Sequence, residues 1–333
     1  MRKKWFIGVD ISKKTLDVVI YDSKKKHSDS ANYLKVSNDE EGFNRMLSWF
    51  QGKRMSLSGM VIGMESTGIY GFDLRVFLES KGIDHCVYMP LALKRSLGLT
   101  RGKNDKLDAE RIAYYTWLHR EELSCSKLSG SAVLRLQELS NERKTLVKQQ
   151  AAYKAYLTEM DGRERTASCV RAEEMLAFLK AQMDTVEKEM EEVISRDSSL
   201  SHNYRLLLSI KGIGSVNAIH TIIHTNNFEA FETARQFACY LGIAPFGHTS
   251  GTTVKGKPKV LRMGPKQLKA DLSQAANSAI VWDKELKAYY ERKRKEGKAY
   301  GVVLNAVKFK LVCRMFAVVK RGTPFVELMN YKS

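Results

Sequence analysis

The chain has 333 residues, 44% of them hydrophobic, and a mean hydropathy of −0.34, which predicts a folded protein of two or three domains. No apolar stretch approaches the roughly 18 to 20 residues that span a bilayer, which argues against a membrane protein. Five scattered cysteines without C-x-x-C spacing argue against a zinc site or a disulfide framework and favour the cytoplasm. The net charge is +18, and residues 201–333 carry 22 Lys and Arg against 8 Asp and Glu. This excess predicts a surface that binds nucleic acid, although a solvated basic surface has the same composition.

Residues 1–123 alternate between expected strands and expected helices, which predicts a mixed sheet flanked by helices. The expected strands, rich in Val, Ile, Tyr and Phe, are 5–12, 15–22, 31–37, 59–65 and 84–89. The expected helices are 39–51, 71–81, 91–98 and 104–119.

Four acidic residues stand where this first domain would bring them together. Asp10 follows the apolar stretch Phe-Ile-Gly-Val, and Glu65 follows the similar stretch Val-Ile-Gly-Met, so both lie at one sheet edge if the first and fourth strands pair. Asp105 and Asp108 are three residues apart and share one helix face. Buried acids repel one another unless a cation lies between them, and oxygen ligands suit Mg²⁺ or Mn²⁺. The set predicts a divalent-metal site for phosphodiester chemistry; the alternative is acids that are solvated or cap a helix.

Residues 124–199 predict a helical connector. Apolar residues at helical spacing run through 131–160, a break follows at Asp161-Gly162, and a heptad pattern comes next. The heptad positions are Leu176, Leu179, Met183, Val186, Met190 and Val193. About two and a half heptads are too short to be stable alone. This helix should therefore pair with the preceding helix of its own chain or with a second copy.

Residues 200–333 predict a mostly helical domain that contains a phosphate-binding motif. The segment Leu208-Ser-Ile-Lys-Gly-Ile-Gly-Ser-Val resembles a helix-hairpin-helix motif, which holds the DNA backbone through N–H groups and a helix N-terminus. The candidate contacts are Lys211, Gly212 and Gly214. The simpler alternative is a tight turn between packed helices.

A long loop is expected over 242–264, and loops of this length often carry function. Ser250 stands there among hydroxyl-bearing neighbours, and the cations after it would hold a phosphate and offset developing negative charge. These cations are Lys255, Lys257, Lys259, Arg262 and Lys266. A serine needs a base or a metal to become a nucleophile, and His248 is a local candidate for the base. The alternative is a Ser-Gly turn without chemistry.

Taken in order, several segments resemble the DEDD transposases of bacterial insertion sequences, in the insertion-sequence one-ten family. They are Gly8-Val-Asp-Ile-Ser12, Glu65-Ser-Thr-Gly-Ile-Tyr70, Lys103-Asn-Asp-Lys-Leu-Asp-Ala109, the hairpin Ile210-Lys-Gly-Ile-Gly214, the tract Arg235-Gln-Phe-Ala-Cys-Tyr-Leu-Gly-Ile-Ala-Pro245 and the Ser250-Gly-Thr252 loop. The resemblance covers nearly the whole chain. It implies an N-terminal RuvC-like domain of the RNase H type over 1–123, a coiled-coil connector over 124–199 and a C-terminal transposase domain over 200–333.

The resemblance also implies roles for these residues. Asp10, Glu65, Asp105 and Asp108 would hold the metal, and Ser250 would attack a DNA phosphate and become covalently linked to it. Better-understood members of the family are guided by a bridge RNA that pairs with donor and target DNA, and their two sites meet between protomers of a dimer or tetramer. The leading hypothesis is therefore an RNA-guided bacterial DNA recombinase. The alternatives are a RuvC-like metal nuclease that hydrolyses junction DNA with water, and a non-enzymatic nucleic-acid-binding protein.

Overall fold

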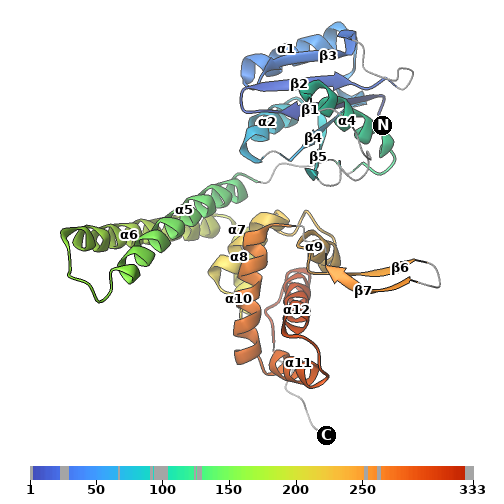
Figure 1. Cartoon of the computed structure of the whole chain (residues 1–333). Coiled ribbons are helices and arrows are strands. Elements are labelled where there is room, and N and C mark those ends of the chain that lie inside the picture. The colour runs from blue at the N-terminus through green and yellow to red at the C-terminus, as the bar shows by residue number, and fades with distance from the viewer. Residues whose placement is uncertain are drawn as a thin grey trace. The chain divides into compact units, whose positions relative to one another are not determined.

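The computed structural model describes residues 3–22, 30–66, 68–90, 93, 104–123, 125, 130–250, 254–260 and 264–326. At 30, 68–69, 245–250 and 254–260 it describes the backbone alone. The chain forms two compact units, Met1–Leu128 and Ser129–Ser333, whose elements are labelled in Figure 1. The expected division into three domains stays a prediction.

Unit 1 is built on a five-stranded mixed sheet in the order β3-β2-β1-β4-β5. Its strands are β1 (Trp5–Ile11), β2 (Thr15–Ile20), β3 (Tyr33–Ser37), β4 (Met60–Glu65) and β5 (Asp84–Tyr88). The β1–β2 and β2–β3 pairs are antiparallel, whereas β1–β4 and β4–β5 are parallel. The mixed sheet is confirmed, and so is the pairing of the first strand with the fourth.

Helices cover both faces of this sheet, because its strands alternate apolar side chains between the two sides. The helices are α1 (Glu40–Gly52), α2 (Phe72–Ser80) and α4 (Asp105–Leu118), and short 3-10 turns lie at Ser30–Asn32, Leu57–Gly59 and Gly68–Gly71. Ile7 and Val9 of β1 pack with α1 and α2 in one core, and α4 lies across the opposite face (Figure 1). The expected helix over 91–98 lies outside the described residues except for Leu93.

Two glycines allow α4 to lie directly on the sheet. A Cβ at Gly8 would come within 2.0 Å of the Ala109 carbonyl oxygen, and a Cβ at Gly63 would come within 2.0 Å of Thr116 Oγ1. These glycines are register partners in the parallel β1–β4 pair. The absence of two neighbouring side chains therefore sets the distance between α4 and the strands that carry Asp10 and Glu65.

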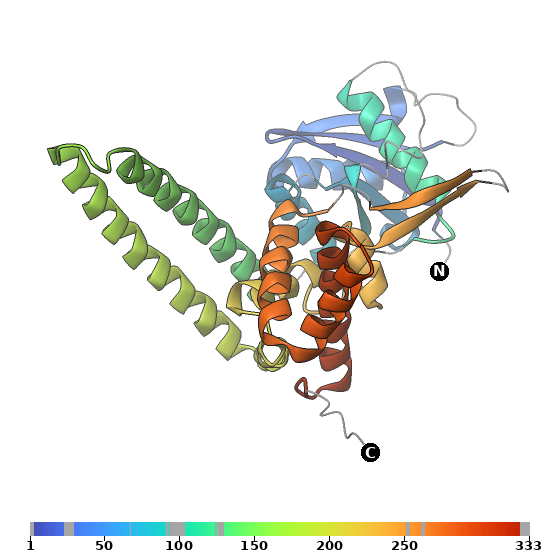
Figure 2. The same ribbon diagram turned by 60° about the horizontal axis from the view of Figure 1, so that its bottom comes forward.

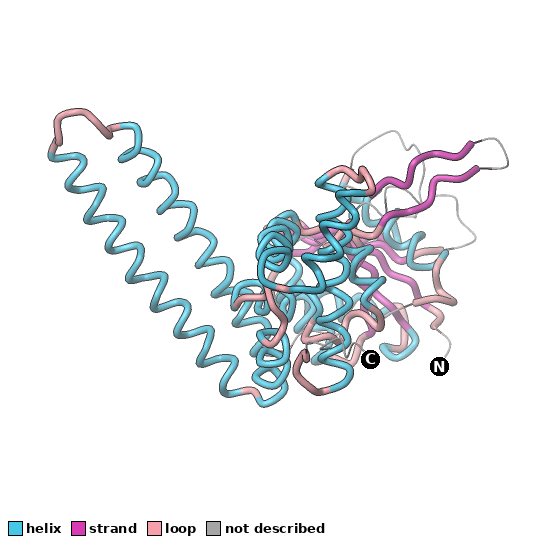
Figure 3. The backbone as a smooth tube through the Cα atoms, turned by 90° about the horizontal axis from the view of Figure 1, so that it is seen from below, coloured by secondary structure: helices cyan, strands magenta, loops and turns pink. Residues whose placement is uncertain are grey.

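Unit 2 begins with a long helical hairpin formed by α5 (Ser131–Glu159) and α6 (Ala167–Arg196). Figures 2 and 3 show these helices side by side and antiparallel. The heptad residues Leu179, Val186 and Met190 are 3–4% exposed, because α6 turns this face toward α5. The short heptad thus pairs within the chain, and the expected break at residues 161–162 is confirmed.

The remaining helices of unit 2 share one apolar core. They are α7 (Ser198–Leu208), α8 (Ser215–Thr225), α9 (Ala234–Tyr240), α10 (Lys266–Trp282), α11 (Lys284–Lys295) and α12 (Tyr300–Arg321). A polar chain links three helices: Ser140 Oγ of α5 lies 2.9 Å from His220 Nε2, whose Nδ1 lies 2.7 Å from Asp271 Oδ2. No helix among the described residues combines the length and apolar character needed to cross a membrane.

The expected loop over 242–264 is wrong in one respect, because most of it forms a β-hairpin. β6 (Pro245–Ser250) pairs antiparallel with β7 (Val254–Val260), and Figure 1 shows the hairpin extending away from the helices of its own unit. Its glycines and prolines are typical of loops, but β7 alternates Val-Lys-Gly-Lys-Pro-Lys-Val with period two. Pro258 is tolerated because a strand of a two-stranded ribbon has one unpaired edge.

Candidate functional site

The carboxylates at two neighbouring strand ends lie on the face that α4 covers. Residues two apart in a strand point to the same side, so Asp10 shares a face with Gly8, and Glu65 shares one with Gly63. Both glycines lie under α4, and both acids are partly buried. The parallel pairing of β1 with β4 therefore brings these two predicted acids to one edge of the sheet.

The first turn of α4 supplies the other two predicted acids. Asn104 caps the helix by accepting a hydrogen bond from the Lys106 N–H at 3.1 Å, and the helix begins at Asp105. The Asp105 side chain is 60% exposed, whereas that of Asp108 is 30% exposed. The helix dipole favours negative charge in this turn, which offsets part of the repulsion among the acids.

Asp10 is affected electrostatically by every other predicted acid. Its pKa is raised from 3.8 to about 6, first by burial and then by neighbouring negative charges. Those charges, in decreasing order of effect, belong to Asp108, Asp105, Asp17 and Glu65. The fold has thus gathered the three partners that the sequence predicts around one carboxyl group, and their summed negative charge opposes its ionisation.

Cationic side chains of the chain itself neutralise part of this cluster. Arg111 NH1 lies 2.6 Å from Asp108 Oδ1, and Lys35 Nζ lies 3.9 Å from Asp105 Oδ2. Within the described residues, no three Asp, Glu, His or Cys side chains are grouped closely enough to hold a metal ion. The oxygen donors and the excess negative charge fit Mg²⁺ or Mn²⁺. Coordination by three of them would require the carboxylates to turn toward one another.

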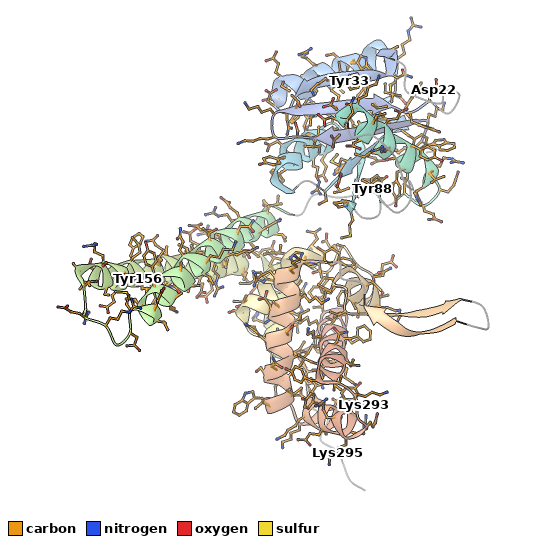
Figure 4. The ribbon with its side chains drawn as sticks, viewed as in Figure 1. Asp22, Tyr33, Tyr88, Tyr156, Lys293 and Lys295 are labelled. Carbon is orange, nitrogen blue, oxygen red and sulfur yellow. The ribbon has the colours of Figure 1, made fainter. Side chains whose placement is uncertain are left out.

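A fifth acid, Asp17 in the middle of β2, belongs to the same cluster and was not predicted. It stands opposite Asp10 in the β1–β2 register and is 2% exposed. Its carboxylate accepts a hydrogen bond from the Tyr33 hydroxyl at 2.5 Å and lies 3.2 Å from Lys35 Nζ; Tyr33 is labelled in Figure 4. Burial, followed by this hydrogen bond, raises the pKa of Tyr33 to about 12. The available sequence signal was an acid inside the apolar run Thr-Leu-Asp-Val-Val-Ile.

The predicted helix-hairpin-helix segment joins α7 to α8 in unit 2. Gly212 has φ +92°, and a Cβ there would lie 2.7 Å from the Ala275 carbonyl oxygen of α10, so both backbone angle and packing require glycine. Gly214 is the N-cap of α8, and no side-chain hydrogen bond caps this end. Lys211 is exposed at the same turn. The helix terminus therefore presents N–H groups of the kind that bind phosphate.

Ser250 is the last residue of β6 and stands opposite Val254, where the hairpin closes. Gly251–Thr253 and the predicted contact Arg262 lie outside the described residues. His248 stands opposite Gly256.

The remaining basic candidates lie on or after the returning strand. Lys255 stands opposite Thr249, Lys259 stands opposite Phe246, and Lys257 falls at the register shift between Phe246 and His248. Lys266 is the first residue of α10 and is exposed. The four predicted acids thus belong to unit 1, whereas the serine, the helix-hairpin-helix segment and the predicted basic contacts belong to unit 2.

Comparisons with known proteins match both units. A family model of IS110-type DEDD transposases matches residues 7–160, and a model described as Transposase IS116/IS110/IS902 family matches residues 204–291. The chain is 26% identical over 339 residues to the pilin gene-inverting protein of Moraxella bovis, covering 97% of this chain and 98% of that protein; the pilin gene-inverting protein of Moraxella lacunata gives the same figures. An uncharacterized 43.6 kDa protein of insertion element IS110 from Streptomyces coelicolor is 30% identical over 124 residues, 37% of this chain and 30% of that protein. The two matched ranges contain all four predicted acids and Ser250.

Proposed function

Because the chain belongs to the IS110 family of DNA transposases and recombinases, we propose that it cuts and rejoins DNA through a transient phosphoserine linkage at Ser250. The observation that carries this proposal is geometric: the pairing of β1 with β4 brings Asp10 and Glu65 to one sheet edge, and the first turn of α4 carries Asp105 and Asp108. Two relatives are named for the inversion of a pilin gene, a process that needs strands to be rejoined as well as cut. A covalent intermediate would keep the bond energy for rejoining.

Unit 1 is proposed to be a RuvC-like domain of the RNase H type. Its strand order, with three antiparallel strands followed by two parallel ones, supports this assignment. In such a domain the acids at the ends of β1 and β4 and on α4 form one site. Asp10, Glu65, Asp105 and Asp108 would hold Mg²⁺ or Mn²⁺ there, with Asp17 beneath them.

The proposed chemistry exchanges one phosphodiester bond for another. Ser250 Oγ forms a bond to phosphorus, and the bond from phosphorus to one deoxyribose oxygen breaks. The serine proton is released to a base, and the leaving sugar oxygen takes up a proton. Attack by a strand hydroxyl on the phosphoserine then forms the new DNA linkage and restores the serine, so no high-energy cofactor is consumed. A divalent cation, when bound, would orient the phosphate and stabilise its negative charge.

Two partners besides DNA are part of the proposal. A guide RNA that pairs with donor and target is suggested by the family resemblance, and the net charge of +18 suits a complex with nucleic acid. A second copy of the chain is supported by α6, where Val170, Met175 and Phe178 are 41%, 38% and 57% exposed although α6 already packs on α5. Light scattering of the wild type and of Phe178→Gln tests assembly through this face. An unchanged mass would rule the face out.

A covalent-trapping experiment tests the serine. The purified protein is mixed with donor DNA, target DNA, the cognate RNA and Mg²⁺, and adducts are resolved on a denaturing gel and mapped by mass spectrometry. We expect a wild-type adduct on the peptide that contains Ser250 and none with Ser250→Ala. Thr249→Val, which removes the neighbouring hydroxyl, is the matched control and should retain the adduct.

The same assay separates the competing functions. An adduct that persists in Ser250→Ala would disprove the serine role. Mg²⁺-dependent cleavage without an adduct, unaffected by Ser250→Ala, would identify a nuclease that uses water. Asp10→Asn should bind DNA but form no adduct, and full recombination by this variant would show that the acids are structural. Salt-sensitive DNA binding without any strand breakage would identify a non-enzymatic nucleic-acid-binding protein.

A further inference from the structure

Side chains of two helices of unit 2 hold the segment that leads into the hairpin strand β6. Lys269 of α10 donates a hydrogen bond from Nζ to the Gly242 carbonyl oxygen at 2.9 Å. Asn305 of α12 donates from Nδ2 to the Ile243 carbonyl oxygen at 2.6 Å. Lys308 follows Asn305 by three residues and therefore shares its helix face. Side chains from two helices thus surround the root of the hairpin that carries Ser250.

Lys308 is a largely buried lysine. It is 8% exposed, and its Nζ is not among the fully enclosed side-chain atoms that lack a hydrogen-bond partner in the described part of the chain. Burial lowers its pKa, and the positive charge of Lys269 lowers that pKa further. Lysine is rarely this buried unless it is paired, and a second cation nearby makes the arrangement more costly.

The hairpin segment supplies no carboxylate to neutralise these lysines. The segment 242–266 contains no Asp or Glu, so the hairpin itself cannot provide one. Asp271, two residues after Lys269, already accepts hydrogen bonds from Gln267 at 3.0 Å and contacts His220 at 2.7 Å. The hydrogen-bonding atoms of the Asp271 carboxylate are thus engaged by residues other than these lysines.

We propose that Lys308, together with Lys269, forms a phosphate-binding site at the root of the hairpin and receives a backbone phosphate of the bound DNA. An anion between the two ammonium groups would replace their repulsion by two charge-assisted hydrogen bonds. Lysine is suited to this role because its ammonium is a compact charge with three donors. Since Lys269 also holds the Gly242 carbonyl, a phosphate here would couple DNA binding to the position of β6. The inference rests on the proposed function only for the identity of the polyanion.

The full-length variant Lys308→Met tests the site, because it keeps the apolar stem and removes the charge. Without ligand, we expect the variant to melt at a temperature equal to or above that of the wild type, since a largely buried positive charge that is repelled by a second cation is lost. Inorganic phosphate, compared with chloride at equal ionic strength, should raise the melting temperature of the wild type more than that of the variant. Affinity for a DNA duplex, measured by fluorescence anisotropy, should fall about tenfold, or about 1.4 kcal/mol.

Two further variants control this measurement. Lys320→Met removes an exposed lysine from the last turn of α12 and should leave the phosphate response unchanged. Lys269→Met should also lose the phosphate response, but with a lower melting temperature, because the hydrogen bond to Gly242 is lost.

Each outcome decides one question. A Lys308→Met protein that melts lower and keeps the wild-type response to phosphate and DNA would show that Lys308 is structural and would overturn the proposal. A lost phosphate response with unchanged DNA affinity would overturn the assignment to DNA and indicate a free-phosphate site. Ser250→Ala should retain the phosphate response and the wild-type affinity for DNA, so failure of the covalent chemistry is distinguishable from failure of this site.

Discussion

The acidic cluster of unit 1 gathers negative charge, whereas the lysine pair of unit 2 gathers positive charge. Both gather like charges on packed elements, and both are only partly neutralised by the chain. Arg111 and Lys35 contact the acids, whereas Lys308 has no acidic contact among the described residues. The first region is complementary to a cation and the second to an anion. A bound metal ion would neutralise the first region, and a DNA phosphate would neutralise the second.

The two regions also differ in the way that they are built. The acids stand on sheet strands and on a helix that touches those strands through Gly8 and Gly63, so their geometry depends on tertiary packing. Ser250 stands at the end of a two-stranded ribbon, whose geometry depends mainly on local pairing. The acidic site should therefore respond strongly to packing changes at a distance, and the hairpin should respond mainly to changes in charge.

The largest expected effect comes from placing a side chain in the close contact between α4 and the sheet. Gly8→Ala places a Cβ within 2.0 Å of the Ala109 carbonyl oxygen, and the backbone must move to relieve the overlap. We expect the free energy of unfolding of unit 1 to fall by about 3 kcal/mol or more. The yield of the protein–DNA adduct should fall as well. Gly52→Ala, where nothing lies within 4 Å, is the control. Equal urea midpoints for Gly8→Ala and wild type would contradict the close contact.

A smaller effect is expected from the charge of Asp10 in metal-free protein. The folded-state pKa of about 6 exceeds the ordinary 3.8, so the folded protein holds a proton that the unfolded chain has released. Stability should therefore fall as the pH rises from about 4 to about 6. Asp10→Asn should lack this contribution and gain on the order of 1–2 kcal/mol over wild type at pH 7.5. Urea unfolding with EDTA at pH 4.5 and 7.5 measures it.

Added Mg²⁺ sharpens the same experiment. Wild type should be stabilised by Mg²⁺ at pH 7.5, because the cation favours the ionised form of Asp10, and Asp10→Asn should respond less. Asp184→Asn, a change at an exposed residue of α6, should behave like wild type. Equal pH profiles for wild type and Asp10→Asn would mean that the acids do not converge in solution.

The smallest effect is expected from single lysines of the hairpin. Lys255→Gln should weaken DNA binding without changing protein stability, because a two-stranded ribbon carries little of the core. If this lysine contacts a phosphate, the slope of log affinity against log salt should fall by roughly 0.9. The control is Lys188→Gln on the exposed side of α6. An unchanged slope would show that Lys255 is not part of the DNA-binding surface.

Most of the first site could be predicted because its signals are local. Each of the two predicted strand acids, Asp10 and Glu65, directly follows a short apolar run, and the spacing of Asp105 and Asp108 is helical. Asp17 was missed because its role depends on standing opposite Asp10. The register of two paired strands cannot be read from the sequence of either strand alone. The hairpin was missed because its glycines and prolines hid a period-two pattern.

Local pattern was sufficient to predict the alternation of strands and helices over residues 1–123, the helix break at residues 161–162 and the basic composition of residues 201–333, because periodicity and charge are properties of neighbouring residues. Tertiary structure alone decided that the heptad pairs with its own chain, that Gly8 and Gly63 set the height of α4 above the sheet, and that Asp17 joins the acids. It also decided that Lys308 of α12 is buried. These features arise between residues far apart in the chain, where burial and mutual repulsion depend on how the elements pack.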